Sequence, residues 1–376
     1  MEEINAYIES ARSEAAYQNY LVVRERVLSM MREASNQEHL PSRYWSEELA
    51  GFDYMLDASP IIIQKLREHC YHITGLRSYE YRRHHSHQAG AFLNKLNALR
   101  RLDHKNLFVP ESSLLGGFGH DINGVKVNID TLKFYESLIA MDQGGLLDYL
   151  RDPPGSGRSV AVEIGAGWGG FAYQLKKIMP NLTYVVIDLP QTFLFSGTYL
   201  KTAFPDARFF IYGDGPLSIL KTDLLKYDFV LLPHYQFRNV ELAKIDLGIN
   251  MVSFQEMTTD QVLAYLQRLS ELGCPVFYSH NRDRSKHNKE LSAVGVLMKR
   301  FYKLLEITVL PIPYTSLNFP PPNQRLLLSR TINIPALVRR IPMFFCRRPP
   351  ERPAKRGSLY EYRHLIGSNP KIVHLP

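Results

Sequence analysis

The second half of the chain alternates short apolar runs with stretches in which apolar positions recur at helical spacing. The apolar runs cover residues 160–164, 184–187, 208–212, 229–232, 249–254, 276–279 and 304–310. The helical stretches between them cover residues 169–179, 191–203, 216–225, 238–245 and 258–272. Strands joined through helices are typical of a parallel sheet with helices on both faces. The pattern therefore predicts an α/β fold built on a seven-stranded, doubly wound sheet.

The first half of the chain has a mostly helical pattern. Helical spacing of apolar positions extends over residues 3–35, 46–57, 60–72 and 90–101, and from Asp130 towards Leu150. A linker rich in Pro and Gly follows at residues 151–157. We therefore divide the chain into a helical N-terminal region (1–150), an α/β domain (151–334) and a C-terminal tail (335–376). The N-terminal region is expected to cover the substrate or to join two copies of the chain.

The excess positive charge of the chain lies in the tail. The chain has 45 Lys and Arg residues against 37 Asp and Glu residues, a net charge of +8. Residues 335–376 contain nine of the basic and two of the acidic side chains, so the rest of the chain carries only +1. A nearly neutral body disfavours a nucleic-acid partner. The Pro-rich basic tail is expected to be solvated and partly disordered, and to contact an anionic membrane or an acidic glycan.

Cysteine content and hydropathy indicate a reducing compartment. The three cysteines, Cys70, Cys274 and Cys346, are too few and too widely spaced for a disulfide framework. The first residues are acidic, and no apolar run reaches the roughly 18 residues that a membrane span needs. We therefore expect a soluble cytoplasmic protein, with membrane association through residues 335–376 left open.

The most specific motif is a glycine-rich loop, residues 163–170 with the sequence EIGAGWGG, which follows the first predicted strand and opens a helix. Glycines allow a tight turn and a close approach to a ligand, and the helix N-terminus offers free N–H groups. The same glycines fit the dinucleotide pattern G-x-G-x-x-G, so an NAD-dependent oxidoreductase or epimerase of sugars stays open. Glu163, however, suits a cationic amino-acid group and is unfavourable beside a pyrophosphate.

Acidic residues also end the next two predicted strands, Asp188 the second and Asp214 the third. With these acids in order, the glycine loop resembles motif I of class I S-adenosylmethionine-dependent methyltransferases. The resemblance implies S-adenosylmethionine as the cofactor and a Rossmann-like sheet. It also implies that Asp188 holds both ribose hydroxyls and that Asp214 contacts the adenine amino group. The cofactor-binding residues are then Glu163, Gly165, Gly167, Asp188 and Asp214.

Four further motifs narrow the resemblance. They are GGFG at residues 116–119, VNIDT at 127–131, SFQEM at 253–257 and YSHNR at 278–282. Together, over about residues 110–320, they are similar to the sugar O-methyltransferases of polysaccharide and glycosylated natural-product clusters. This implies methyl transfer to a sugar hydroxyl of a small molecule or glycan. An acceptor that is not a sugar stays open.

Candidate catalytic residues follow the later strands, because ligands of open α/β sheets bind beyond the carboxyl ends of the strands. A sugar hydroxyl needs a general base as it attacks, and histidine has a suitable pKa. We expect His280 to be the base, with Asp283 or Glu256 orienting it, and His234 as the alternative. Each of these residues also has a purely structural interpretation, such as a helix cap or a local ion pair.

Two neighbouring residues are candidates for binding the acceptor. Arg282 offers a guanidinium to a hydroxyl or a carboxylate, and Asn281 offers an amide. No group of residues has a spacing diagnostic of metal ligands, so we assign no metal, although a divalent cation stays open.

Overall fold

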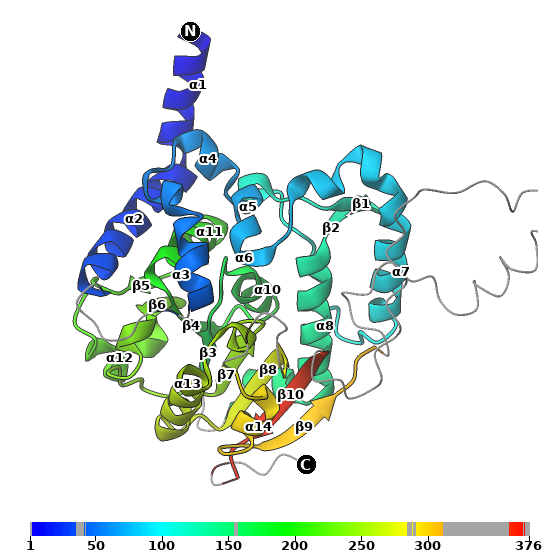
Figure 1. Cartoon of the computed structure of the whole chain (residues 1–376), viewed down its shortest axis with the longest axis vertical. Helices are drawn as coiled ribbons and strands as arrows, with labels where there is room; N and C mark the ends of the chain where they lie inside the picture. The colour runs from blue at the N-terminus through cyan, green and yellow to red at the C-terminus, as the bar shows by residue number, and fades with distance from the viewer. Residues whose placement is uncertain are drawn as a thin grey trace, which may run out of the picture.

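The computed structural model describes residues 2–34, 41, 43–153, 157–283, 288, 291–310, 361–370 and 372. The N-terminal region is helical (Figure 1). Its helices are α1 (Glu2–Ser13), α2 (Ala15–Ala34), α3 (Arg43–Ala50), α4 (Pro60–Gln64), α5 (Leu66–His69), α6 (Tyr71–Thr74) and α7 (Ala89–Arg100). The long helix predicted for residues 3–35 is broken at Glu14, and α1 projects away from the body. Helix α2 buries a stripe of side chains three or four positions apart, Ala16, Tyr20, Val23, Val27 and Met30, as an amphipathic helix does.

A small hairpin leads from these helices to the helix that packs beside the main sheet. Strands β1 (His120–Ile122) and β2 (Val125–Val127) are joined by the predicted Asn123-Gly124 turn, in which both residues have positive φ. Helix α8 (Ile129–Gln143) then begins after Asn128, which forms a reciprocal capping box with Thr131. Helix α9 (Leu146–Arg151) follows.

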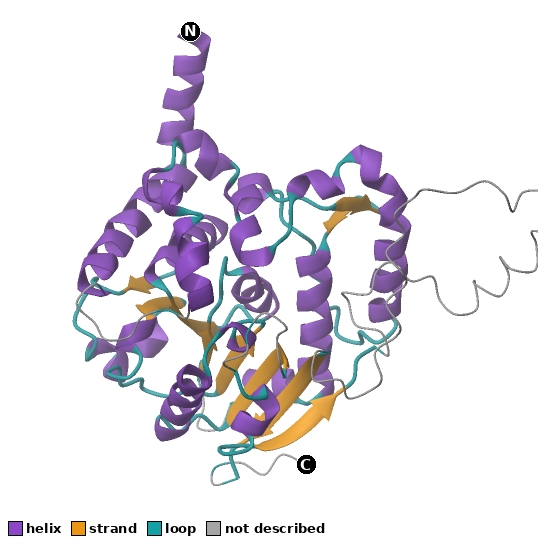
Figure 2. Cartoon of the chain, viewed as in Figure 1, coloured by secondary structure: helices purple, strands orange, loops and turns teal. Residues whose placement is uncertain are grey.

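The α/β half forms one eight-stranded sheet (Figure 2). Its strands are β3 (Ser159–Ile164), β4 (Leu182–Asp188), β5 (Phe209–Ile211), β6 (Phe229–Pro233), β7 (Leu247–Met251), β8 (Val276–Arg282), β9 (Lys303–Ile307) and β10 (Tyr362–Ser368). The order across the sheet is β5-β6-β4-β3-β7-β8-β10-β9. Strands β3 to β8 are parallel, and β10 is antiparallel to both of its neighbours. All seven predicted strands are present, and β10 is an eighth.

Helices cover both faces of this sheet, as the sequence predicts. They are α10 (Gly170–Ile178), α11 (Phe193–Ala203), α12 (Ile219–Thr222), α13 (Thr259–Glu271) and α14 (Val294–Met298). Alternate residues of a strand enter different cores: Tyr184 joins the core under the N-terminal helices, whereas Val185 joins the opposite one. The helix predicted for residues 238–245 is absent, although the residues are described.

Strand β10 corrects the expectation that residues 335–376 form a solvated tail outside the α/β domain. Leu365 and Ile366 are buried on opposite faces of the sheet, between β8 and β9. Arg363 pairs with Asp283 and with Glu306, so one basic side chain of the tail belongs to the folded body. The strand is hard to recognise in the sequence because its apolar core is short and lies among charged residues.

Candidate active site

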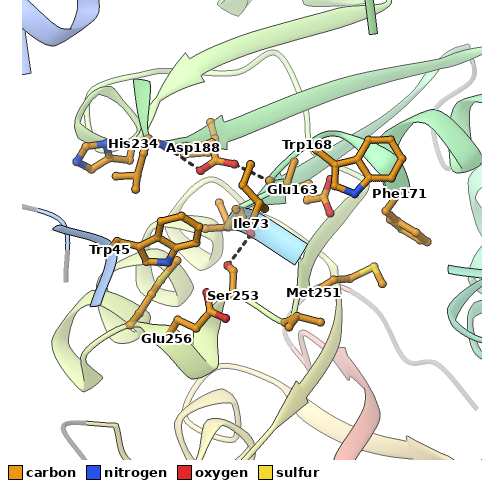
Figure 3. A pocket seen from close by; sticks show the side chains of 18 of the residues that line it. Trp45, Ile73, Glu163, Trp168, Phe171, Asp188, His234, Met251, Ser253 and Glu256 are labelled. Carbon is orange, nitrogen blue, oxygen red and sulfur yellow. Dashed lines mark hydrogen bonds between the residues drawn. The ribbon is translucent and has the colours of Figure 1, made fainter. Parts of the chain in front are cut away.

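A cleft opens at the carboxyl ends of four adjacent strands, β6, β4, β3 and β7 (Figure 3). The strands contribute the residues at or just after their ends, and the glycine loop forms one wall. The opposite wall comes from the N-terminal region, through Pro41, Trp45, Ile73 and Thr74. The cleft therefore lies between the two halves of the chain, at the place where open α/β sheets bind ligands.

The glycine loop needs its glycines for conformation and for space. Gly165 and Gly167 have φ values of +73° and +60°, which side chains with a β-carbon rarely adopt. A β-carbon on Gly165 would lie 2.2 Å from Oγ of Ser253, and one on Gly167 would lie 2.8 Å from Cγ2 of Ile73. The loop is thus packed closely between strand β7 and the N-terminal helices, and α10 begins directly after it.

Asp188 ends β4 and faces the loop. Its Oδ2 accepts a hydrogen bond from the backbone N of Gly167 (2.9 Å), and its Oδ1 accepts one from the backbone N of Leu189 (2.8 Å). Burial raises the pKa of Asp188 to about 6, although these backbone donors oppose the shift. The backbone of Ala166 and the side chain of Thr192 also favour its ionised form, so a ligand hydroxyl would share the carboxylate with these donors.

Glu163 lies near the end of β3, beside Asp188 in the same cleft (Figure 3). Only 2% of its surface is exposed, and its Oε2 accepts a hydrogen bond from the Tyr184 hydroxyl at 2.8 Å. Burial raises the pKa of Glu163 to about 8. In the ligand-free protein the carboxyl group is therefore mostly neutral at pH 7, and a bound cation would favour its ionised form.

Lys133 brings a positive charge to the cleft that the sequence analysis did not identify. Among the described residues it is the one Lys or Arg in the cleft lining. It projects from the second turn of α8, and its Nζ lies 2.8 Å from Oδ1 of Asp130. The other oxygen of Asp130 accepts from the buried Arg67 (2.8 Å) and from Nε1 of Trp168 (3.1 Å). A buried ionic network thus fixes both Lys133 and the indole of the glycine loop.

Two of the predicted catalytic residues, Glu256 and His234, line the cleft. Glu256 ends a short 3-10 turn, Phe254–Glu256, after β7. Burial raises its pKa to about 8, and a hydrogen bond from Trp45 opposes that shift. His234 begins the turn His234–Gln236 after β6. The two residues approach the cleft from opposite sides of the β3–β4 pair, because β6 lies beyond β4 and β7 lies beyond β3.

Asp214 does not reach this cleft. It follows β5, which comes directly after β4 in the chain but is not its neighbour in the sheet. Strand β6 lies between β5 and β4, so the end of β5 is one strand farther from the cleft. Its Oδ1 instead pairs with Nε of Arg26 at 2.9 Å, and its Oδ2 accepts from the backbone N of Ile211 at 2.8 Å. The contact expected between Asp214 and a ligand in the cleft is therefore not supported. The neighbour of β4 on this side is β6, and His234 follows its end.

His280, the residue expected to be the base, also lies outside the cleft lining. Strand β8 continues to Arg282, so His280 is inside the strand rather than beyond its end. Its ring is 1% exposed, stacks on His364 of β10 at 4.2 Å, and has Nδ1 3.1 Å from Oγ of Ser137. Burial lowers its pKa well below the usual value. These contacts hold the His280 ring against α8 and β10, outside the cleft lining.

The residues predicted beside His280 are engaged elsewhere. Asp283 accepts a hydrogen bond from the backbone N of Gly295 (2.7 Å) and pairs with Arg363, so it does not orient His280. Arg282 places its guanidinium 4.4 Å from the centre of the Tyr362 ring. Asn281 donates to Oδ1 of Asn250 at 2.8 Å. None of the three lines the cleft, and Asp283 forms its ion pair with Arg363 of β10.

Asn281 still contributes to the site indirectly. Asn250, which it holds, donates to Oγ of Ser253 at 2.7 Å and to the Ile164 carbonyl at 2.7 Å. These bonds tie the end of β7 to the start of the glycine loop. Val252, which lies between Asn250 and Ser253 in the sequence, also lines the cleft. Its φ of +64° is strained for a β-branched residue.

Within the described residues, no group of three or more His, Cys, Asp or Glu side chains could hold a metal ion. No helix in that part of the chain is both long and apolar enough to cross a membrane.

No protein-family model matches the chain, and no curated protein matches it. Among solved structures, it is similar to an O-methyltransferase family protein from Burkholderia thailandensis, at 12% identity and a TM-score of 0.31, over 64% of this chain and 59% of that one. It is also similar to the pyocyanin biosynthetic protein PhzM, at 12% identity and a TM-score of 0.31, over 62% and 57%. A third similar structure is PigF with SAH, at 12% identity and a TM-score of 0.28, over 58% and 66%. The matches span less than two thirds of each of these proteins, and a likeness of this size specifies no activity.

Proposed function

We propose that the protein is an S-adenosylmethionine-dependent O-methyltransferase. The observation that carries the proposal is the pairing of Glu163 and Asp188 at the ends of adjacent strands, on either side of a glycine loop. This donor set fits a cationic amino acid joined to a nucleoside. Glu163 would bind the ammonium group, Asp188 the two ribose hydroxyls, and the loop backbone would allow close approach. When bound, the cofactor supplies an electrophilic methyl group on sulfonium.

The same observation disfavours an NAD-dependent reaction. A pyrophosphate beside the loop would lie near Glu163, whose buried carboxyl would then have to stay protonated. A bound ammonium group gains an ion-pair partner when Glu163 ionises, whereas a pyrophosphate gains no partner from this carboxyl group in its ionised form.

We assign the general base to Glu256. It lines the cleft, and its pKa of about 8 leaves roughly a tenth of it ionised at pH 7, so its capacity to accept the hydroxyl proton grows as the pH rises towards 8. Glu256 would take the proton of the acceptor hydroxyl as that oxygen receives the methyl group, which the bound cofactor would supply from its sulfonium and which would leave a neutral thioether. His234 remains the alternative, from the β6 side of the cleft.

We further propose a class of acceptor, a location in the cell and a contact for the basic segment. The four family-like motifs favour a sugar hydroxyl in polysaccharide or glycosylated natural-product biosynthesis, in the cytoplasm. The N-terminal region would cover the acceptor, because Trp45, Ile73 and Thr74 line the cleft. The basic segment 347–356, which lies outside the described residues, would contact an anionic membrane or an acidic glycan.

Calorimetric titration with S-adenosylhomocysteine tests the cofactor assignment. We expect micromolar binding by the wild-type protein and loss of at least tenfold in affinity for Asp188→Asn, since the amide cannot accept as a carboxylate does. Asp214→Asn is the matched control, and it should bind as the wild type does. Equal binding by wild type and Asp188→Asn, or binding of NADH in place of S-adenosylhomocysteine, would contradict the proposal.

A further inference from the structure

Trp45 and Glu256 are joined across the cleft although they are more than 200 positions apart in the chain. Trp45 projects from α3 in the N-terminal region, and Glu256 follows β7 of the sheet. The indole N–H of Trp45 lies close enough to the Glu256 carboxyl group to favour its ionised form. In the close-up the two side chains lie next to each other (Figure 3).

The chemistry of this pair suits a ring that bears hydroxyl groups. The indole N–H can only donate, and tryptophan does not ionise in this range, so it holds the carboxylate without competing for its proton. The carboxylate keeps acceptor positions for a hydroxyl. The face of the indole is apolar and packs on the C–H face of a sugar or on an aromatic ring.

Other charged groups also act on Glu256. Lys133 and Arg282 attract its negative charge, and Glu48 repels it. Lys133 already pairs with Asp130, and Arg282 lies over the Tyr362 ring. Among the groups that act on Glu256, Trp45 is the neutral donor from the N-terminal region.

We propose that Trp45 and Glu256 form the acceptor subsite, in which Trp45 is a positioning residue that aims the carboxylate at the attacking hydroxyl and supports the acceptor ring. This inference rests on the proposed methyltransferase function. It assigns the N-terminal region a part in the chemistry, because the site is incomplete without a side chain from α3.

Three variants separate the parts of this inference. Trp45→Phe keeps an aromatic ring and removes the N–H group, Trp45→Leu removes both, and Tyr79→Leu replaces an exposed aromatic residue outside the cleft lining. Calorimetric titration with S-adenosylhomocysteine should show unchanged binding by Tyr79→Leu and continued binding by both Trp45 variants, which reports that the fold is intact.

The first readout needs no acceptor. In a Glu163→Gln background, the infrared carbonyl band of protonated Glu256, assigned by its loss in Glu256→Gln, should titrate near pH 8. Trp45→Phe should raise this midpoint by roughly one pH unit, because the lost hydrogen bond stabilised the ionised form. Tyr79→Leu should leave it in place. An unshifted midpoint in Trp45→Phe would overturn the inference.

The second readout uses turnover with a panel of methyl hexopyranosides, UDP-hexoses and p-nitrophenol. Trp45→Phe should lower kcat and move its acidic limb to higher pH with little change in KM. Trp45→Leu should also raise the acceptor KM by about tenfold, the loss expected for a packed aromatic ring. Equal KM values for the Phe and Leu variants would reject the ring contact. If the wild type fails to bind S-adenosylhomocysteine, the proposed function fails instead.

Discussion

The affinity of the protein for S-adenosylhomocysteine should depend steeply on pH. The carboxyl group of Glu163, which we propose binds the ammonium group of this ligand, is mostly protonated in the ligand-free protein. The pKa of Glu163 in the ligand-free protein is about 8, raised by burial. An ammonium group binds the ionised form of Glu163. Below pH 8, binding must therefore first remove a proton, and this cost falls as the pH rises.

The size of the effect follows from the ionised fraction. With a pKa of about 8, roughly 3% of Glu163 is ionised at pH 6.5 and about half at pH 8. Affinity should therefore rise about fifteen-fold over this range and then level off. Asp188, with a pKa of about 6, adds less than about twofold above pH 6.5.

Isothermal titration calorimetry between pH 6.5 and 8 measures this dependence directly, below the range in which the ligand's own amino group deprotonates. Repeating the titration at pH 7 in two buffers with different ionisation enthalpies should show release of close to one proton. Glu163→Gln should bind weakly and without the slope. Glu256→Gln, which removes a carboxyl of similar pKa, is the matched control and should keep the slope. A pH-independent affinity in the wild type, or the same slope in Glu163→Gln, would refute the reasoning.

Two further predictions concern the scaffold, both measured by urea unfolding. Gly165→Ala should lower the unfolding free energy by more than about 2 kcal/mol, because the left-handed backbone costs about 1–2 kcal/mol and the new β-carbon would also overlap Ser253. Gly273 has a φ of +74° and open space around it, so Gly273→Ala should lose only the backbone part. Equal losses in the two variants would show that Ser253 moves aside at no cost in free energy. Arg363→Met should cost about 2 kcal/mol, because it leaves the buried Asp283 without its cation. The exposed pair of Arg151 with Asp148 is the comparison, since Arg151→Met should cost less than about 1 kcal/mol. Matching losses in these two Arg variants would mean that β10 is not held by Arg363.

Most of the sheet could be predicted from the sequence because β3, β4, β6, β7 and β8 are buried on both faces. Such strands appear as short, nearly continuous apolar runs separated by helical spacing, and all seven predicted runs are strands. Strand β10 escaped prediction because its seven residues include Arg363, His364 and Ser368. Its burial depends on partners in β8 and β9 that sequence periodicity does not reveal.

The cofactor half of the site was more predictable than the acceptor half. Glu163, Gly165, Gly167 and Asp188 lie within one strand–loop–helix–strand unit, so local pattern sets their positions. Asp214 was misplaced because the order of strands across the sheet differs from their order in the chain. The order of strands in the sequence does not show which strand lies next to β4, and so it does not show whether Asp214 or His234 reaches the cleft.

The acceptor half depends on packing between distant segments. His280 was misjudged because β8 runs two residues past it, so its ring meets Ser137 and His364 rather than the cleft. Trp45 and Lys133 were missed because each lies on a helix whose orientation is fixed only by tertiary contacts. One signal was available: Trp45 is one of only two tryptophans in the chain.

The calorimetric comparison of wild type, Asp188→Asn and Asp214→Asn with S-adenosylhomocysteine tests the central assignment most directly. The two aspartates follow neighbouring strands in the chain, but only Asp188 lines the cleft. The proposed site predicts micromolar binding by the wild type and Asp214→Asn, and at least tenfold weaker binding by Asp188→Asn. Wild-type affinity in Asp188→Asn, or no binding by any of the three, would contradict it.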